Sequence, residues 1–173
     1  MATTYTLINS TTIGAGGATS IEFTSIPATY TDLTVVCSLR TTRSFAYDDP
    51  ILQFNNNTSN YSYTVLRGTG SAASSYRASS TTFIYLGECN GDTSTASTFS
   101  NQSIYIPNYT SSSNKPISIA SSQEDNTTAA YSDAIAGLWA NSSAITSLKI
   151  SIASSGASFK QYSSAYLYGI SNA

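Results

Sequence analysis

Histidine is absent from this chain, and charged residues occupy only 9% of its 173 positions, against about 25% in an ordinary globular domain. Without His, the sequence excludes Ser-His-Asp and Cys-His catalysis and most zinc sites. Its seven Lys and Arg residues are dispersed, whereas a nucleic-acid-binding protein needs a dense cationic patch to neutralise phosphates. We therefore expect no nucleic-acid partner.

Cysteines and long apolar runs are also scarce. Two cysteines, Cys37 and Cys89, are too few for a disulfide scaffold. The start of the chain has neither the basic residues nor the apolar stretch of a secretory signal, and no run approaches the roughly 20 apolar residues of a membrane span. We expect a protein folded in a reducing cytosol, with both thiols free and no membrane partner. Because no His could activate it, Cys37 is expected to be a small buried side chain.

Hydroxyl and aromatic side chains take the place of the missing charges. Ser and Thr fill about a third of the chain, 40% of residues are hydrophobic, and 13 are Tyr. Disordered chains lack aromatic and β-branched residues, so this composition can bury a core. Thr, Tyr, Val, Ile and Phe suit a pleated sheet, whereas strong helix formers are few. We predict a single all-β domain spanning residues 1–173.

Alternation of apolar and polar residues with a period of two recurs along the chain and predicts eight to ten short strands. Asn55–Asn57 is expected to turn the chain, because Asn tolerates the left-handed region. Residues 41–50 and 68–80 are predicted loops, the second one long, and the last two strands are expected to pair around Gly156. The candidate strand segments are residues 5–8, 20–24, 32–40, 51–54, 61–67, 82–86, 98–106, 117–121, 129–139, 145–154 and 163–170. Among them, 129–139 is ambiguous, because its Ala-rich spacing could also make a helical turn, and a strand is favoured.

Short strands separated by turns, without helical stretches, favour a β-sandwich, and among sandwiches we predict a jelly roll. The core is expected to come from the inward apolar positions of these strands. These positions are Ile21, Phe23, Leu33, Val35, Leu66, Phe83, Leu86, Ile104, Ile106, Ile117, Ile119, Leu148, Ile150, Ile152, Leu167 and Ile170.

Paired acids are the main place to look for catalysis, because glycoside hydrolysis uses two carboxylates across a cleft. Asp48–Asp49 and Glu124–Asp125 are sequence neighbours in turn-like segments, and we interpret them as solvated loop charges. Glu88–Asp92 resembles a loose calcium loop but lacks the full spacing, so an ordinary hairpin turn is favoured. We predict no enzyme activity, no cofactor and no metal site.

Tyrosine is abundant enough to matter for binding. Tyr61 with Tyr63, and Tyr166 with Tyr168, are spaced i,i+2 and so face one side of a strand. Such pairs could pack on a sheet face or anchor an interface, and the sequence leaves both open. A surface of hydroxyls and amides with a net charge of -2 is prone to association, which suits a protein that joins an assembly.

Two stretches resemble a family of small structural proteins of tailed bacteriophages, including cyanophages. The first, residues 20–33, reads SIEFTSIPATYTDL and continues to Arg40. The second comprises Gly137–Trp139, Ala144–Ile150, Phe159 and Tyr166–Ile170. Gly169 is expected to let another backbone approach the last strand. The sequence departs from the family pattern at 160–163, where Tyr162 stands and the family usually has Gly-Ser.

The resemblance implies a virion component with a β-sandwich or jelly-roll fold that is commonly oligomeric. Our leading hypothesis is a capsid decoration or cement protein, assembled in the bacterial host cytoplasm. It is expected to act as a homo-oligomer, with a trimer favoured, and to bind the phage major capsid protein or another virion protein. The candidate interface residues are Arg40, Arg43, Tyr47, Asp48, Asp49, Tyr61 and Tyr63, together with the segment 68–80.

The alternative is a receptor-binding domain of a tail fibre or tail tip, in which Tyr side chains would grip host glycans. Fibre subunits usually need a stalk or an anchoring N-terminal segment, and here the first predicted strand begins almost at Met1. This favours the head over the tail. A depolymerase is the third hypothesis, and the absence of a convincing carboxylate pair disfavours it.

Overall fold

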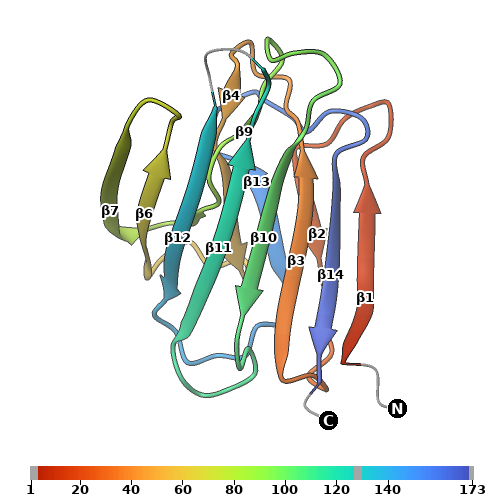
Figure 1. Ribbon diagram of the computed structural model, residues 1–173. Helices are drawn as coiled ribbons and strands as arrows, with labels where there is room; N and C mark the ends of the chain where they lie inside the picture. The colour runs from red at the N-terminus through yellow and green to blue at the C-terminus, as the bar shows by residue number, and fades with distance from the viewer. Residues whose placement is uncertain (1–3, 127–129, 172–173) are drawn as a thin grey trace.

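The architecture is an all-β sandwich, seen in a computed structural model that describes residues 4–126 and 130–171 (Figure 1). Within these residues there is no helix, and hence none long and apolar enough to cross a membrane. The strands are β1 Tyr5–Thr12, β2 Ser20–Phe23, β3 Asp32–Leu39, β4 Tyr47–Asp48, β5 Pro50–Phe54, β6 Tyr61–Gly68, β7 Ala73–Thr81, β8 Ile84–Tyr85, β9 Cys89–Asn90, β10 Ser100–Ile106, β11 Lys115–Gln123, β12 Tyr131–Trp139, β13 Leu148–Ile152 and β14 Ser164–Ile170.

An eight-stranded antiparallel sheet forms one layer, in the order β1-β14-β3-β10-β11-β12-β6-β7. A four-stranded sheet, β2-β13-β5-β8, packs behind it, and the short pair β4-β9 lies at the upper end in Figure 1. The predicted β-sandwich is confirmed. The jelly-roll connectivity is not, because β10, β11 and β12 pair in succession as a meander within one sheet.

The core lies between the two sheets and follows from the alternation in the sequence. On β11 the buried Ile117 and Ile119 alternate with the exposed Ser118 and Ala120, so one sheet face is apolar and the other carries small side chains. Each aliphatic side chain removed from water in this way contributes about 1.5 to 3 kcal/mol.

An aromatic cluster closes the lower end of this core. Trp139 lies 5.6 Å from Phe54 and 6.1 Å from Tyr61 between ring centroids. The Tyr61 hydroxyl accepts a hydrogen bond of 2.9 Å from the Phe54 backbone N–H. Because its hydroxyl is paired, the ring can be buried with the apolar residues.

Several sequence predictions need correction. Residues 73–80 of the predicted long loop belong to β7, an exposed edge strand paired with β6. Its small hydroxyl side chains gave no alternation to detect. Leu66 is 60% exposed, because β6 turns Val65 inward and Leu66 outward. The last two strands do not pair with each other: β13 lies in the small sheet and β14 in the large one.

Other local predictions hold. The ambiguous segment 129–139 forms β12 from Tyr131 onward, while Ala129 lies outside the described residues. Asn55 and Asn56 adopt φ values of 51° and 54° in the predicted turn. The two cysteines are buried and unpaired.

Two positions near the end of the chain behave differently from expectation. A Cβ on Gly169 would lie 2.3 Å from the ring of Tyr30, so this glycine admits a side chain and not a second backbone. Tyr162 adopts φ 74° and is 68% exposed. The turn thus has the geometry that favours glycine, although a bulky residue occupies it.

Candidate functional site

A pocket lined by aromatic and charged side chains opens between the β6–β7 edge of the large sheet and strands β5 and β8 of the small sheet. We call it the aromatic pocket, and its volume is about 320 Å³. This is near the lower end of the range for small-ligand sites, roughly 300 to 1,000 Å³. Its lining residues are Asp49, Ile51, Tyr63, Arg67, Tyr76, Phe83, Tyr85, Glu88 and Ala153.

Arg67 organises the pocket. The alternation of β6 that turns Tyr61, Tyr63 and Val65 inward also turns Arg67 inward. Its Nε and Nη2 donate to the two Asp133 carboxylate oxygens, both at 2.8 Å, and its Nη1 donates to Glu88 Oε1 at 2.9 Å. The Asp133 contact is the paired geometry that fits a guanidinium to a carboxylate.

Aromatic rings complete the surroundings of this guanidinium. Its Cζ lies 4.7 Å from the ring centroid of Tyr131, 5.7 Å from Tyr85 and 5.8 Å from Tyr76. It also donates to the Tyr85 hydroxyl at 2.6 Å. Burial opposes its charge, but Asp133, Tyr85 and Glu88 together raise the pKa of Arg67 above its ordinary value. Arg67 is therefore a permanent cation held by fixed partners.

Glu88 contributes a carboxyl group whose pKa is strongly raised. It is 3% exposed, and burial, followed by the nearby Asp49 charge, raises its pKa from 4.5 to about 8, while Arg67 acts in the opposite direction. Burial also raises the pKa of Tyr76 to about 12. At neutral pH Glu88 retains its proton, so the pocket contains a carboxyl that can change charge near physiological pH.

The structure separates the predicted interface residues into two groups. Arg43, Tyr47, Asp49 and Tyr63 are partly exposed, whereas Arg40, Asp48 and Tyr61 are buried, at 6%, 0% and 1% exposure. The buried three are not available to a partner in this conformation, so this part of the prediction is corrected. For the other four, an interface role stays a prediction.

Arg40 is a loop organiser. Its guanidinium donates to four backbone carbonyls of the β9–β10 connection at 2.8 to 3.2 Å and to one hydroxyl. These hydrogen bonds hold the loop in one conformation. The acceptors are the carbonyls of Asp92, Ser94, Thr95 and Thr98 and the Thr98 hydroxyl.

Asp48 accepts hydrogen bonds within its own neighbourhood. Its Oδ1 takes the Ser154 hydroxyl at 2.7 Å and the Asp49 N–H at 2.9 Å, and it lies 3.3 Å from Arg43 Nη1. Arg43 Nη1 is also 3.5 Å from Asp49 Oδ2. Asp48 is thus a structural carboxylate, while Asp49 reaches the aromatic pocket.

The segment 88–92 does not form a calcium loop. Glu88 lines the pocket, Cys89 and Asn90 form β9, and the exposed Asp92 pairs with Lys160. Across the described part of the chain, no group of three or more His, Cys, Asp or Glu side chains is placed to hold a metal ion.

Sequence reasoning missed Arg67, Asp133 and Tyr85, and it included Tyr76 only as part of the candidate segment 68–80. A signal was available for the first two, since each occupies an inward position of a strand, where an unpaired charge would be costly. A charge in the buried register predicts a partner on a neighbouring strand, and β12 supplies it: Asp133 lies directly opposite Arg67.

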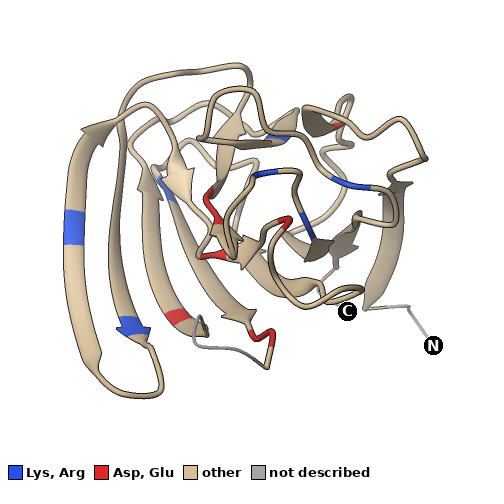
Figure 2. Cartoon of the chain, turned by 90° about the horizontal axis from the view of Figure 1, so that it is seen from above, with Lys and Arg blue, Asp and Glu red and all other residues tan. Residues whose placement is uncertain are grey.

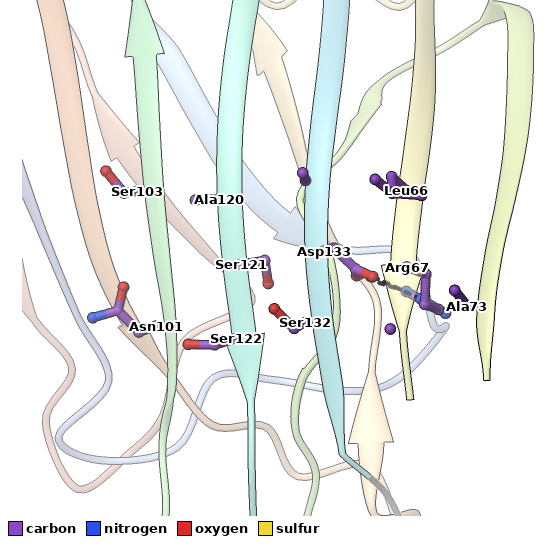
Figure 3. Close-up of a pocket in the computed structure, with 12 residues that line it drawn as sticks. Leu66, Arg67, Ala73, Asn101, Ser103, Ala120, Ser121, Ser122, Ser132 and Asp133 are labelled. Atoms are coloured by element: carbon purple, nitrogen blue, oxygen red, sulfur yellow. Dashed lines mark hydrogen bonds and ion pairs between the residues drawn. The ribbon is translucent and has the colours of Figure 1, made fainter. Parts of the chain in front are cut away.

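The other prominent surface is the outward side of the large sheet, which we call the outer face. Its middle is a shallow trough of about 610 Å³, where Ser103, Ala120 and Ala134 lie side by side on β10, β11 and β12, and Leu66 follows on β6 (Figure 3). Beneath it, Figure 3 also draws the Arg67–Asp133 ion pair.

The outer face carries almost no charge. On the described strands of this sheet, the charged side chains that point outward are those of Asp32, at the beginning of β3, and Arg77, on the edge strand β7. Figure 2 shows how few coloured segments interrupt the ribbon of this sheet. The chain therefore has two distinct surfaces: a charged, enclosed pocket and an open, neutral sheet face.

Comparison of the chain with protein-family models, with curated proteins and with solved structures returned no match.

Proposed function

We propose that the chain is a virion structural protein of a tailed bacteriophage, a decoration or cement protein that binds the outside of the head through the outer face. The observation that carries this proposal is the neutral, hydroxyl-rich character of that face across eight strands. A sheet face without charge can be covered at little desolvation cost, because there are few ions to strip of water.

The dimensions of the outer face suit a protein partner. Eight strands with a spacing of about 4.8 Å and a length of about 25 Å make a face on the order of 900 Å². A standard protein interface buries about 800 Å² on each partner. Tyr105 and Tyr166 are 40% and 38% exposed on this face, beside the small residues, and would serve as aromatic anchors.

The mechanism is linkage. A subunit that binds the assembled shell and not the free capsid protein stabilises the shell by mass action, and an oligomer that holds several capsomers gains further from multivalency. We propose a homotrimer with the phage major capsid protein as partner. Light scattering of the purified chain tests the trimer directly: a monomer over the micromolar range would refute it.

The central test uses heads that lack the protein. Added wild-type chain is expected to bind them and to raise the temperature at which they release DNA, whereas Ala120→Arg is expected to abolish both effects. Ala120 is exposed, so the variant should fold, and Thr58→Arg in an exposed loop is the matched control. Equal binding by wild type and Ala120→Arg would refute the use of the outer face.

A receptor-binding domain of the tail is the second candidate, and the aromatic pocket is the observation that favours it. Tyr76 is 40% exposed at this pocket and could stack on a sugar ring. Immunogold labelling of purified particles separates the two candidates. Gold over heads supports decoration, gold at tail tips supports receptor binding, and unlabelled particles contradict both.

A further inference from the structure

The carboxyl groups around the aromatic pocket outnumber the cations. Asp48, Asp49, Glu88 and Asp133 are in contact with only two guanidiniums, those of Arg43 and Arg67. Arg67 makes two hydrogen bonds to Asp133 and one to Glu88. The carboxyl side of the pocket is therefore short of positive charge.

Glu88 lines the pocket and has one carboxyl oxygen without a hydrogen-bond partner in the described part of the chain. Its side chain is only 4% exposed, and no donor of the described residues reaches its Oε2. The neighbouring Asp49 is itself an acceptor when ionised, so the two carboxyls can form a hydrogen bond only by sharing a proton. When Glu88 loses its proton, Oε2 becomes a buried acceptor without a donor, which is costly, and a ligand N–H group would remove that cost.

The remaining walls of the pocket are aromatic. Ring centroids are 6.4 Å apart for Tyr63 and Phe83, 6.0 Å for Tyr63 and Tyr85, and 6.4 Å for Tyr76 and Tyr85. Aromatic faces attract cations and give no stabilisation to anions. The fold already uses this chemistry once, because the Arg67 guanidinium lies over three tyrosine rings.

We propose that the aromatic pocket binds an alkylammonium group, which donates to Glu88 Oε2 and Asp49 while its alkyl chain lies against Tyr63 and Phe83. The pocket volume of about 320 Å³ suits a primary amine on a short chain. Two sources supply this chemistry: a free amine, or a lysine side chain presented by another protein. The inference is independent of the outer face and of the proposed decoration function.

Binding is expected to release a proton. The charged and titratable groups that act on Glu88 or are acted on by it come from the segment before β5 and from β6, β7, β8, β9 and β12. They are Asp49, Arg67, Tyr76, Tyr85, Cys89 and Tyr131. Glu88 holds its proton up to a pKa of about 8 in this setting. A bound ammonium takes the place of that proton, so the affinity for amines should rise as the pH rises from 6 to 7.5, by up to about tenfold per unit.

Calorimetric titration of the full chain with n-butylammonium tests the proposal. We expect saturable binding at pH 7.5, binding at least about tenfold weaker at pH 6, and no saturable heat from n-butanol or glucose. A lysine-containing tripeptide with blocked ends distinguishes the sources: tighter binding of the peptide indicates a lysine of a partner protein, and equal or weaker binding indicates a free amine. Saturable glucose binding without amine binding would overturn the proposal.

Variants locate the binding site. Glu88→Gln and Asp49→Asn should each weaken butylammonium binding at least about tenfold, while Asp92→Asn, an exposed acid paired with Lys160, should bind as wild type does. Asp49 is partly exposed, so Asp49→Asn keeps the test valid if Glu88→Gln fails to fold, which near-ultraviolet circular dichroism would reveal. Unchanged affinity in the folded variants, or affinity independent of pH, would refute the proposal.

Discussion

Arg40 and Arg67 are both withdrawn from solvent within one sandwich, but their charges are satisfied in opposite ways. Arg40 donates to four backbone carbonyls and one hydroxyl of a single loop. Arg67 is held by two carboxyl groups, a phenol and three aromatic rings from several strands. Carbonyl partners cannot change their charge, whereas carboxyl partners can, so the first arrangement is purely structural and the second can respond to pH and ligands.

The largest expected effect is the loss of stability on removal of the Arg40 guanidinium. Arg40→Met removes a donor set and leaves four buried or partly buried carbonyls without it, and we expect a loss of about 3 to 5 kcal/mol in the free energy of unfolding. Chemical denaturation followed by fluorescence measures it. The matched control is Arg77→Met on the exposed strand β7, expected to change stability by less than about 0.5 kcal/mol. Similar losses in both variants would contradict the structural role.

The next largest effect is expected from removal of the Asp133 charge that pairs with Arg67. Asp133→Asn removes the charge that pairs with both Nε and Nη2, but Glu88 remains as a partial replacement. We therefore expect a smaller loss of about 2 to 3 kcal/mol, by the same denaturation measurement. Asp92→Asn, in an exposed pair, should cost less than about 1 kcal/mol. If Asp133→Asn lost no more stability than the control, the Arg67–Asp133 ion pair would be contradicted.

A third experiment sharpens the comparison through pH. In the unfolded chain Glu88 loses its proton near the ordinary pKa of 4.5, whereas in the folded chain it keeps the proton up to about 8. Unfolding between these values releases a proton, so stability attributable to this group falls as the pH rises, by up to about 1.4 kcal/mol per unit. Denaturation midpoints at pH 6 and 7 measure the slope.

Glu88→Gln should remove that contribution. The difference in pH slope between the wild type and this variant is the informative quantity, since all other titrating groups are common to both. Arg40→Met, which touches no titrating carboxyl of the aromatic pocket, should retain the wild-type slope. If Glu88→Gln retained it too, the raised pKa of Glu88 would be wrong.

The smallest expected effect is a gain in stability at the turn next to Arg40. The turn at Tyr162 borders Arg40, because the Ser163 hydroxyl accepts from the Arg40 N–H and donates to its carbonyl. Tyr162 holds φ 74°, so Tyr162→Gly is expected to stabilise the protein by about 1 kcal/mol through relief of the left-handed strain. Thermal unfolding measures the gain, and a lower melting temperature would contradict it.

Alternation in the sequence predicted most of the fold and little of the candidate site. Strand β11 was predictable because Ile alternates with small residues there, and β10 and β14 because Ile or Leu alternates with Tyr. The edge strand β7 was not, because Ser and Ala carry no periodic signal when both faces are exposed. The jelly roll is not confirmed, and alternation could not have established it, because strand order depends on pairings between distant segments.

Two predicted interface residues, Asp49 and Tyr63, line the aromatic pocket. The rest of the candidate site was missed because charges were assigned to loops by their position in the sequence. Asp49 was interpreted as a solvated loop charge together with Asp48, yet Asp49 lines the aromatic pocket and Asp48 is fully buried. Glu88 was predicted to lie in a hairpin turn, but the property that matters for the site is the burial of its side chain. Burial of a loop residue is a tertiary property, and only inward strand positions such as Arg67 and Asp133 could have indicated it.

The position of β14 sets the order in which the molecule can be completed. This strand comes from the end of the described chain but lies between β1 and β3, which come from its beginning. During synthesis, β1 has no neighbour in the large sheet until β14 leaves the ribosome. Pairing of such distant segments is slow, on the order of milliseconds to seconds. A nascent chain thus keeps the edges of β1 and β3 unpaired until β14 emerges, and a polypeptide stopped before β14 would be prone to aggregate.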